Sequence, residues 1–159
     1  FNSGADKIAI NSEGVKNPKF ITLLANKYGS QSIISSIEAK KINNEWIVFT
    51  TNGRDMTKLR VIEWAKKCEN LGAGELLITS IDREGTGKGV DKDLFSKISE
   101  EVKIPVIISG GVGNYNHIID LRSKIQLDAI ALARTLHFNL LDIKKVKEIL
   151  SKKQYVGSN

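Results

Sequence analysis

Five short apolar runs, separated by segments of helix length, constrain this chain more than any other feature of its sequence. The runs are rich in Ile, Leu and Val and lack a polar alternation, which is typical of parallel strands buried on both faces. They cover residues 7–10, 32–37, 75–81, 105–109 and 129–132. Helical apolar spacing predicts helices over residues 18–28, 58–71, 91–102, 115–124 and 141–152.

This alternation predicts an α/β fold in which right-handed crossovers place helices outside a parallel sheet. The expected host is a (βα)8 barrel of the TIM type, which typically needs about 250 residues and eight strands. With 159 residues, the chain is expected to be a single domain, residues 1–159, that covers about five βα units of such a barrel. Either the sequence is part of a longer chain, or another polypeptide completes the sheet, or the fold is an open doubly wound sheet.

One segment departs from the alternation. Residues 40–51 read KKINNEWIVFTT, and Asn43 and Asn44 separate two β-prone runs within it. This pattern predicts a small hairpin inserted after the second strand.

Charge and composition narrow the classes of function. Twenty-four Lys and Arg against 18 Asp and Glu give a net charge of +6, which favours anionic ligands. The lysines are scattered and form no stripe interleaved with aromatic residues, so we expect no nucleic-acid partner. No apolar run approaches the roughly 20 residues of a membrane-spanning helix, so we expect no membrane span. No secretory signal is readable at the start of the sequence.

Cysteine and histidine usage points the same way. The single Cys68 excludes an internal disulfide and favours a cytoplasmic setting. His117 and His137 have no neighbours at metal-ligand spacing, so no metal site is expected. Dinucleotide-binding and P-loop motifs are absent, and we predict no cofactor.

The residues that follow the apolar runs are unusually polar. In parallel α/β folds ligands bind at the carboxyl ends of the strands, so these residues are the candidate site. They are Asn11, Ser12, Glu38, Lys40, Thr79, Asp82, Ser109, Gly110, Gly111, Ala133 and Arg134. The glycine amides of residues 109–113 suit a phosphate, which Arg134 in the next unit can share; a tight turn without a ligand is the alternative.

Residues 79–89, TSIDREGTGKG, form the most informative stretch. A buried strand opens here into hydroxyls, a carboxylate and a glycine loop that contains Gly85 and Thr86. This composition offers acceptors for substrate hydroxyls, amides for a phosphate and a loop able to close over a ligand. Ion pairs and capping around Arg83 and Glu84 are the structural alternative.

Glu38 follows the second apolar run, and Lys40 points to the same side of that strand. A carboxylate at a strand end can act as a general base. An ion pair with Lys40 or Lys41 is the structural alternative.

Several motifs in order resemble the cyclase subunit of imidazole glycerol phosphate synthases. They are GADKIAINS, KFITLLANKYGSQSII leading into SIEAKK, GAGELLITSIDREGTGKG and IPVIISGGVG. The resemblance runs through nearly the whole chain and covers strands four to eight of that barrel. It implies a lyase-type cyclisation in histidine biosynthesis. Ammonia from a glutaminase subunit, the partner in a heterodimer, would convert a phosphoribulosyl-formimino aminoimidazole carboxamide ribotide to imidazole glycerol phosphate and AICAR.

The resemblance also implies roles for single residues. The family uses two aspartates as acid and base; Glu38 matches the one on strand five, whereas the strand-one position lies outside this sequence, which predicts an inactive chain. Lys7 and Glu75 match charged residues that gate ammonia at the glutaminase face, an ordinary ion pair being the alternative. Phosphate-binding positions match Asn11, Ser12, Gly85, Gly110, Gly111, Ala133 and Arg134, and substrate-lining positions match Thr79, Asp82 and Ser109. Arg134 departs from the small hydroxyl residue common in the family.

Three other interpretations remain open at this point. One is a paralogue that works with a glutaminase to amidate a nucleotide-linked or surface sugar, which the departures at Glu38 and Arg134 favour. Another is a non-catalytic partial barrel that binds phosphate. The sugar isomerase of the same pathway shares the phosphate loops but matches residues 72–86 less well. Because a five-stranded sheet would expose apolar edges, we also expect self-association rather than a stable monomer.

Overall fold

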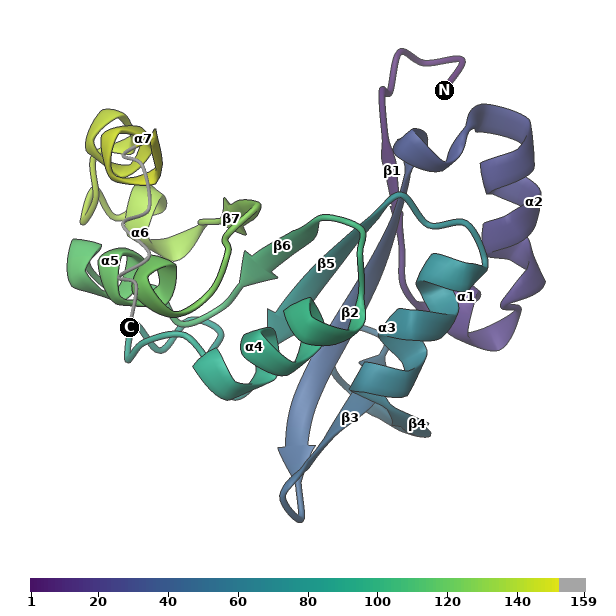
Figure 1. Ribbon diagram of the computed structural model, residues 1–159, viewed down its shortest axis with the longest axis horizontal. Coiled ribbons are helices and arrows are strands. Elements are labelled where there is room, and N and C mark those ends of the chain that lie inside the picture. Colours follow the sequence, from purple (N-terminus) through teal and green to yellow (C-terminus); the bar gives the residue numbers. More distant parts are fainter. Residues whose placement is uncertain (152–159) are drawn as a thin grey trace.

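The computed structural model describes residues 1–151, which form a seven-stranded sheet with helices packed against one of its faces (Figure 1). The strand order is β4-β3-β2-β5-β6-β7, and β1 pairs with β2. Five strands are parallel: β1 (Ile8–Ile10), β2 (Ile33–Ile42), β5 (Glu75–Ser80), β6 (Val106–Ser109) and β7 (Ala129–Ala131). The predicted fold class, a partial barrel of alternating βα units, is confirmed.

Most of the helices lie in the intervals that apolar spacing indicated. They are α1 (Ser12–Lys16), α2 (Lys19–Tyr28), α3 (Val61–Asn70), α4 (Lys92–Glu101), α5 (Tyr115–Lys124), α6 (Arg134–His137) and α7 (Ile143–Ser151), with a short 3-10 turn, η1, at Ser30–Ser32. The sequence did not predict α1, because a helix of about one turn carries too little apolar periodicity to be read. Residue 152, the expected end of the last helix, lies outside the described residues. Among residues 1–151, no helix is both long and apolar enough to cross a membrane.

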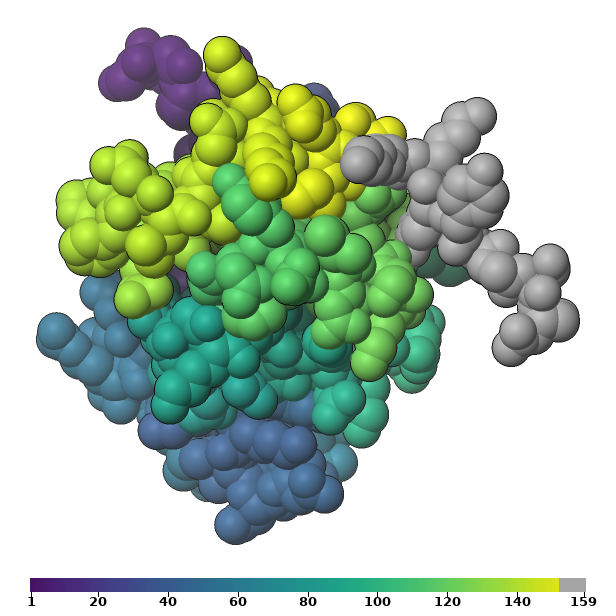
Figure 2. Space-filling model, turned by 90° about the vertical axis from the view of Figure 1, so that its left-hand side faces the viewer, coloured from purple at the N-terminus to yellow at the C-terminus, as the bar shows by residue number. Residues whose placement is uncertain are grey.

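The hydrophobic core lies between the sheet and the helices. Val61, Trp64, Ala65 and Cys68 form one buried stripe of α3, which packs against β2 and β3. On the sheet, alternate residues such as Leu76 and Ile78 are fully buried under the helices. Figure 2 shows α5 to α7, green to yellow, as one continuous surface at the end of the molecule where β7 lies in Figure 1.

The second parallel strand extends further than its apolar run. The first part of β2 pairs with β1, and residues 38–42 pair with the antiparallel strand β3 (Glu45–Thr50). Asn43 and Asn44 form the turn with φ values of 47° and 69°, the left-handed conformation that two-residue hairpin turns require. Glu38 therefore lies inside a ten-residue strand rather than at its end.

A further strand, β4 (Asp55–Arg60), pairs with β3 and precedes α3. The sequence pattern predicted a helix from residue 58, and this start was wrong. Met56, Lys58 and Leu59 are compatible with a helix, but pairing of β4 with β3 overrides that weak local preference.

Candidate functional site

The sheet register brings the predicted polar residues into one row. Glu38 on β2 is the direct partner of Thr79 on β5, and Thr79 is the direct partner of Ser109 on β6. Ser109 in turn pairs with Ala131 on β7. Paired residues in adjacent strands project from the same face, so the three polar side chains share the face that is turned away from the helices.

The Glu38 carboxylate is held by two donors. Its Oε2 accepts a 2.7 Å hydrogen bond from Asn11 Nδ2 and a 3.0 Å hydrogen bond from the backbone N–H of Gly53. The other amide atom, Asn11 Oδ1, is buried and has no hydrogen-bond partner among the described residues. The loop after β1 and the turn after β3 therefore both meet at Glu38, and an unused acceptor lies beside it.

The structural alternative for Glu38, an ion pair with Lys40 or Lys41, does not form among the described residues. In residues 1–151 the carboxylates in ion pairs are Glu45, Glu63, Glu75, Glu101 and Asp120. Lys40 shares the face of Glu38, but its ammonium lies 5.7 Å from the ring centroid of Phe49. Ser12, the first residue of α1, uses its Oγ to accept a 3.0 Å hydrogen bond from the N–H of Thr51.

A cavity of about 260 Å³ lies at the carboxyl ends of β6 and β7. The structure places six of the predicted residues in its wall: Gly85, Ser109, Gly110, Gly111, Ala133 and Arg134. Ser109 belongs both to this wall and to the row that begins at Glu38. The row and the cavity are thus parts of one continuous region.

Close backbone contacts between two glycine loops shape this cavity. A Cβ atom at Gly111 would lie 2.2 Å from the carbonyl oxygen of Gly89, and one at Gly113 would lie 2.1 Å from that of Gly87. Gly89 also donates a 2.8 Å hydrogen bond to the carbonyl of Gly111. Such contacts exclude a side chain at Gly111 and Gly113, which explains these two glycines of the SGGVG segment in packing terms.

Arg134 lies at the edge of the cavity. Its Nη1 is 3.0 Å from the position a Cβ atom of Gly87 would take, and its guanidinium lies 5.9 Å from the ring centroid of Phe138. Glu84 and Gly87 also line the cavity, although neither was predicted to be a site residue. Their position in the same glycine loop was the available signal for them.

Two predicted residues of that loop point elsewhere. Asp82 Oδ2 accepts a 2.8 Å hydrogen bond from the backbone N–H of Lys41, and Thr86 Oγ1 donates a 2.7 Å hydrogen bond to the carbonyl of Arg83. Neither side chain lines the cavity. Asp82 ties the loop to the hairpin, and Thr86 holds the loop's own turn.

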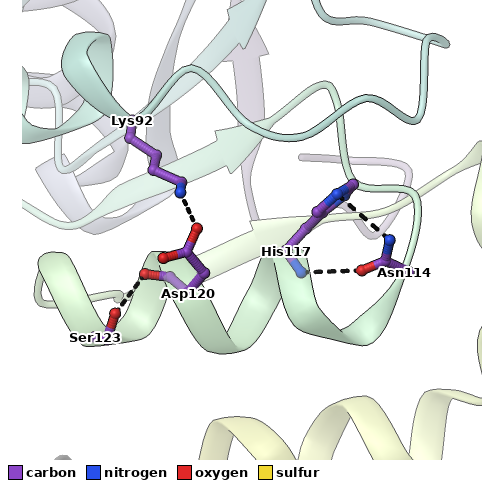
Figure 3. A network of polar contacts seen from close by, with 5 residues as sticks. All are labelled: Lys92, Asn114, His117, Asp120 and Ser123. Carbon is purple, nitrogen blue, oxygen red and sulfur yellow. Dashed lines mark hydrogen bonds and ion pairs between the residues drawn. The ribbon is translucent and has the colours of Figure 1, made fainter.

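The start of α5 is capped from within (Figure 3). Asn114 Oδ1 accepts a 3.2 Å hydrogen bond from the N–H of His117, and His117 Nδ1 accepts a 3.0 Å hydrogen bond from the N–H of Gly113. Lys92 on α4 forms an ion pair with Asp120. Residues 1–151 contain no cluster of three or more His, Cys, Asp or Glu side chains able to hold a metal ion.

Lys7 and Glu75 lie at the opposite end of the parallel strands. Lys7 precedes β1 and Glu75 begins β5, and their side chains form an ion pair. The two charges meet across the start of β2, because residue 34 on β2 pairs with Glu75.

Cys68 lies outside this region and is buried in the core. Its Sγ is 3.0 Å from Ser35 Oγ, and burial raises the pKa of the thiol to about 11. A thiol with this pKa is protonated near neutral pH, so Cys68 has no nucleophilic role in this structure.

Comparison with known proteins assigns the chain to a protein family. Residues 1–142 match the family described as "Histidine biosynthesis protein". The chain belongs to this family. The chain is also similar, over almost its full length, to proteins named "Imidazole glycerol phosphate synthase subunit HisF".

Three of these HisF proteins illustrate the range. The protein of Chlorobium phaeobacteroides is 44% identical over 150 residues, which are 94% of this chain and 60% of that protein. The proteins of Saccharolobus solfataricus and Pyrobaculum aerophilum are 45% and 42% identical, over 95% and 96% of this chain and 60% of each relative. The chain thus spans about 60% of the length of the curated relatives it matches.

Proposed function

We propose that this chain carries the part of a cyclase site that binds both phosphates of the ribotide substrate and supplies one of two acid–base carboxylates. The observation that carries the proposal is the register of Glu38, Thr79 and Ser109, which leads from a held carboxylate directly into the glycine cavity. The HisF relatives support the reaction class. In it, ammonia closes the imidazole ring of imidazole glycerol phosphate and AICAR is released.

The cavity residues have distinct roles in this proposal. Backbone amides of Gly85, Gly110 and Gly111 surround a phosphate, and Arg134 adds a full positive charge to it. Thr79 and Ser109 hydrogen-bond substrate hydroxyls along the row. Asn11 and Ser12 hold the second phosphate at the Glu38 end of the row, together with Lys40, which shares the face of Glu38.

Titration with glycerol phosphate tests the binding half of the proposal. We expect Arg134→Ala to weaken phosphate binding at least about tenfold, since a charge-assisted contact is lost. Arg60→Ala is the matched control, because Arg60 forms ion pairs with Glu45 and Glu63 on β3 and α3, away from the cavity. Equal affinities for the two variants would contradict the phosphate assignment.

Turnover of the ribotide with ammonium salts tests the chemistry. We expect the chain to be inactive alone and active when a polypeptide supplies the first three βα units of a HisF relative. In that reconstituted enzyme, Glu38→Gln should lower kcat at least about a hundredfold, because Gln cannot take up a proton. Unchanged turnover by the Gln variant would remove Glu38 from the mechanism.

We also infer a glutaminase partner at the end where Lys7 and Glu75 form their ion pair. Ammonia would pass this pair to reach Glu38. Lys7→Met in the reconstituted complex should lower glutamine-dependent turnover and leave turnover with ammonium salts unchanged. Equal losses with both nitrogen sources would assign the pair a purely structural role.

The guanidinium of Arg134 in the cavity wall favours one alternative, a paralogue that amidates a nucleotide-linked or surface sugar. The same assay with a sugar nucleotide in place of the ribotide separates the two reactions. Phosphate binding without turnover of either substrate would indicate the non-catalytic partial barrel.

A further inference from the structure

The turn between β3 and β4 contains three consecutive residues in the left-handed region. Their φ values are 54° at Thr51, 57° at Asn52 and 75° at Gly53. A β-branched residue such as Thr rarely adopts this conformation, because it strains the backbone. Such a backbone persists where surrounding contacts determine it.

The contacts of this turn lead to the candidate site. Gly53 N–H donates to Glu38 Oε2 at 3.0 Å, and Thr51 N–H donates to Ser12 Oγ at 3.0 Å. Two amides of one strained turn therefore bind side chains of two different elements, Glu38 within β2 and Ser12 at the start of α1. A turn serving only to connect β3 with β4 would not require these bonds.

The turn is also supported from behind. A Cβ atom at Gly53 would lie 3.3 Å from Ile81 Cδ1, so the loop after β5 packs closely against this glycine. Ile81 N–H in turn donates a 2.9 Å hydrogen bond to the carbonyl of Ala39 on β2. These contacts fix the direction in which the Gly53 N–H points.

Both donors to Glu38 use the same oxygen. Asn11 Nδ2 and Gly53 N–H bind Oε2, and Oε1 has no hydrogen-bond partner among the described residues. Glu has one more rotatable bond than Asp, and a misplacement of about 1 Å can cost around a hundredfold in rate. Two converging donors remove this additional freedom.

We propose that the turn at residues 51–53 is a positioning element for Glu38: Gly53 N–H and Asn11 anchor Oε2, and Oε1 exchanges the proton with the substrate. This inference rests on the acid–base role proposed for Glu38 above. Gly53 is a positioning residue, since it acts through Glu38 and not on the substrate. The left-handed backbone of the turn directs the Gly53 N–H at Oε2 and so holds the Glu38 side chain, which is longer than that of Asp, in position.

Amide hydrogen exchange tests the anchor without requiring any turnover. The exchange rate of the Gly53 N–H is measured in the chain itself, in Glu38→Ala and in Glu38→Gln. We expect Ala to accelerate exchange at least about tenfold, because a hydrogen bond to a charged acceptor is lost, and Gln to accelerate it less. The N–H of Gly29, which bonds to the carbonyl of Ala25 on α2, should exchange equally in all three. A Gly53 rate indifferent to residue 38 would overturn the proposal.

Kinetics of the reconstituted enzyme test the consequence. Gly53→Ala keeps the N–H but adds a methyl group at a positive φ and against Ile81, so we expect kcat to fall at least about tenfold with little change in KM. Gly4→Ala is the matched control, because Gly4 has a φ of 92° with no atom within 4 Å of the added methyl group. An unchanged kcat for Gly53→Ala would also overturn the proposal. Failure of the cyclase reaction itself would show as absent turnover in every variant while the exchange result still stands.

Discussion

Glu38 on β2 lies directly opposite Thr79 on β5. The two residues are 41 positions apart in the sequence, and the parallel pairing of their strands alone brings them together. Because Thr79 also pairs with Ser109, a single register connects the proposed carboxylate with the proposed phosphate cavity. A slip of one residue in β5 would turn Thr79 to the helices and break the row.

Replacing Asn11 with Asp would put a second carboxylate where Nδ2 now lies 2.7 Å from Glu38 Oε2. Like charges at this distance disfavour the doubly ionised pair, so we expect a loss of about 2 kcal/mol in the free energy of unfolding near neutral pH. Urea unfolding measures the loss. Asn26→Asp, exposed on α2, adds the same charge away from Glu38 and should leave the free energy of unfolding nearly unchanged.

Adding a methyl group at Gly113 should destabilise the protein more than adding one at Gly85. At Gly113 the new atom would meet the Gly87 carbonyl oxygen at 2.1 Å, so the backbone of one loop must move. At Gly85 it meets no atom within 4 Å, and only the φ of 69° opposes it. We expect a loss of about 3 kcal/mol for Gly113→Ala and about 1 kcal/mol for Gly85→Ala. Equal unfolding midpoints would contradict the close packing of the two loops.

Asp91 joins the hairpin to α4. Its Oδ2 accepts a 2.9 Å hydrogen bond from Trp46 Nε1, and its Oδ1 accepts a 3.2 Å hydrogen bond from the N–H of Leu94. Asp91→Ala removes both bonds and should cost about 2 kcal/mol of stability, whereas Trp46→Phe removes only the indole bond and should cost about 1 kcal/mol. A double-mutant cycle on urea unfolding measures their coupling. Additive losses would show that the indole contact contributes nothing through Asp91.

Cys68 should react slowly with thiol reagents in the folded protein. Burial raises its pKa from 9.0 to about 11, which lowers the thiolate fraction about a hundredfold near neutral pH. Labelling of Cys68 in the folded protein should therefore be at least about a hundredfold slower than in urea. Steric protection by the core would slow it further. The sign for stability follows from the raised pKa. The contribution of the neutral thiol is complete below about pH 9 and is lost as the pH rises through about 11.

The chain by itself should associate in solution. Leu77 and Ile107 lie on the sheet face away from the helices and are only half-buried, and β7 pairs with β6 alone among the described strands. Unpaired edges and exposed apolar surface favour association. Sedimentation at increasing concentration measures it. A monodisperse monomer with cooperative unfolding would contradict this prediction and show that the sheet is stable without a partner.

The sequence by itself determined the parallel core of this protein. Non-alternating apolar runs such as residues 75–81 lead to buried strands, and the α3 stripe at Val61, Trp64 and Cys68 identified its packing face, because both patterns arise from burial alone. The Asn43–Asn44 pair marked a turn through its local backbone preference. The polar residues after the strands identified the region of the candidate site for the same reason, since strand ends in parallel sheets converge.

Only the tertiary structure decided which of these residues meet. Strand β4 forms because β3 offers it a pairing edge, and no local signal in residues 55–60 outweighs that. Asp82 bonds to Lys41 and not into the cavity, and Glu38 meets Gly53 instead of a lysine. Such hydrogen bonds depend on loops placed by distant segments of the chain, so residue type and spacing cannot specify them. The pattern of buried apolar residues can be read from the sequence because it is local. The partners of polar side chains cannot, because they depend on how the fold places distant segments.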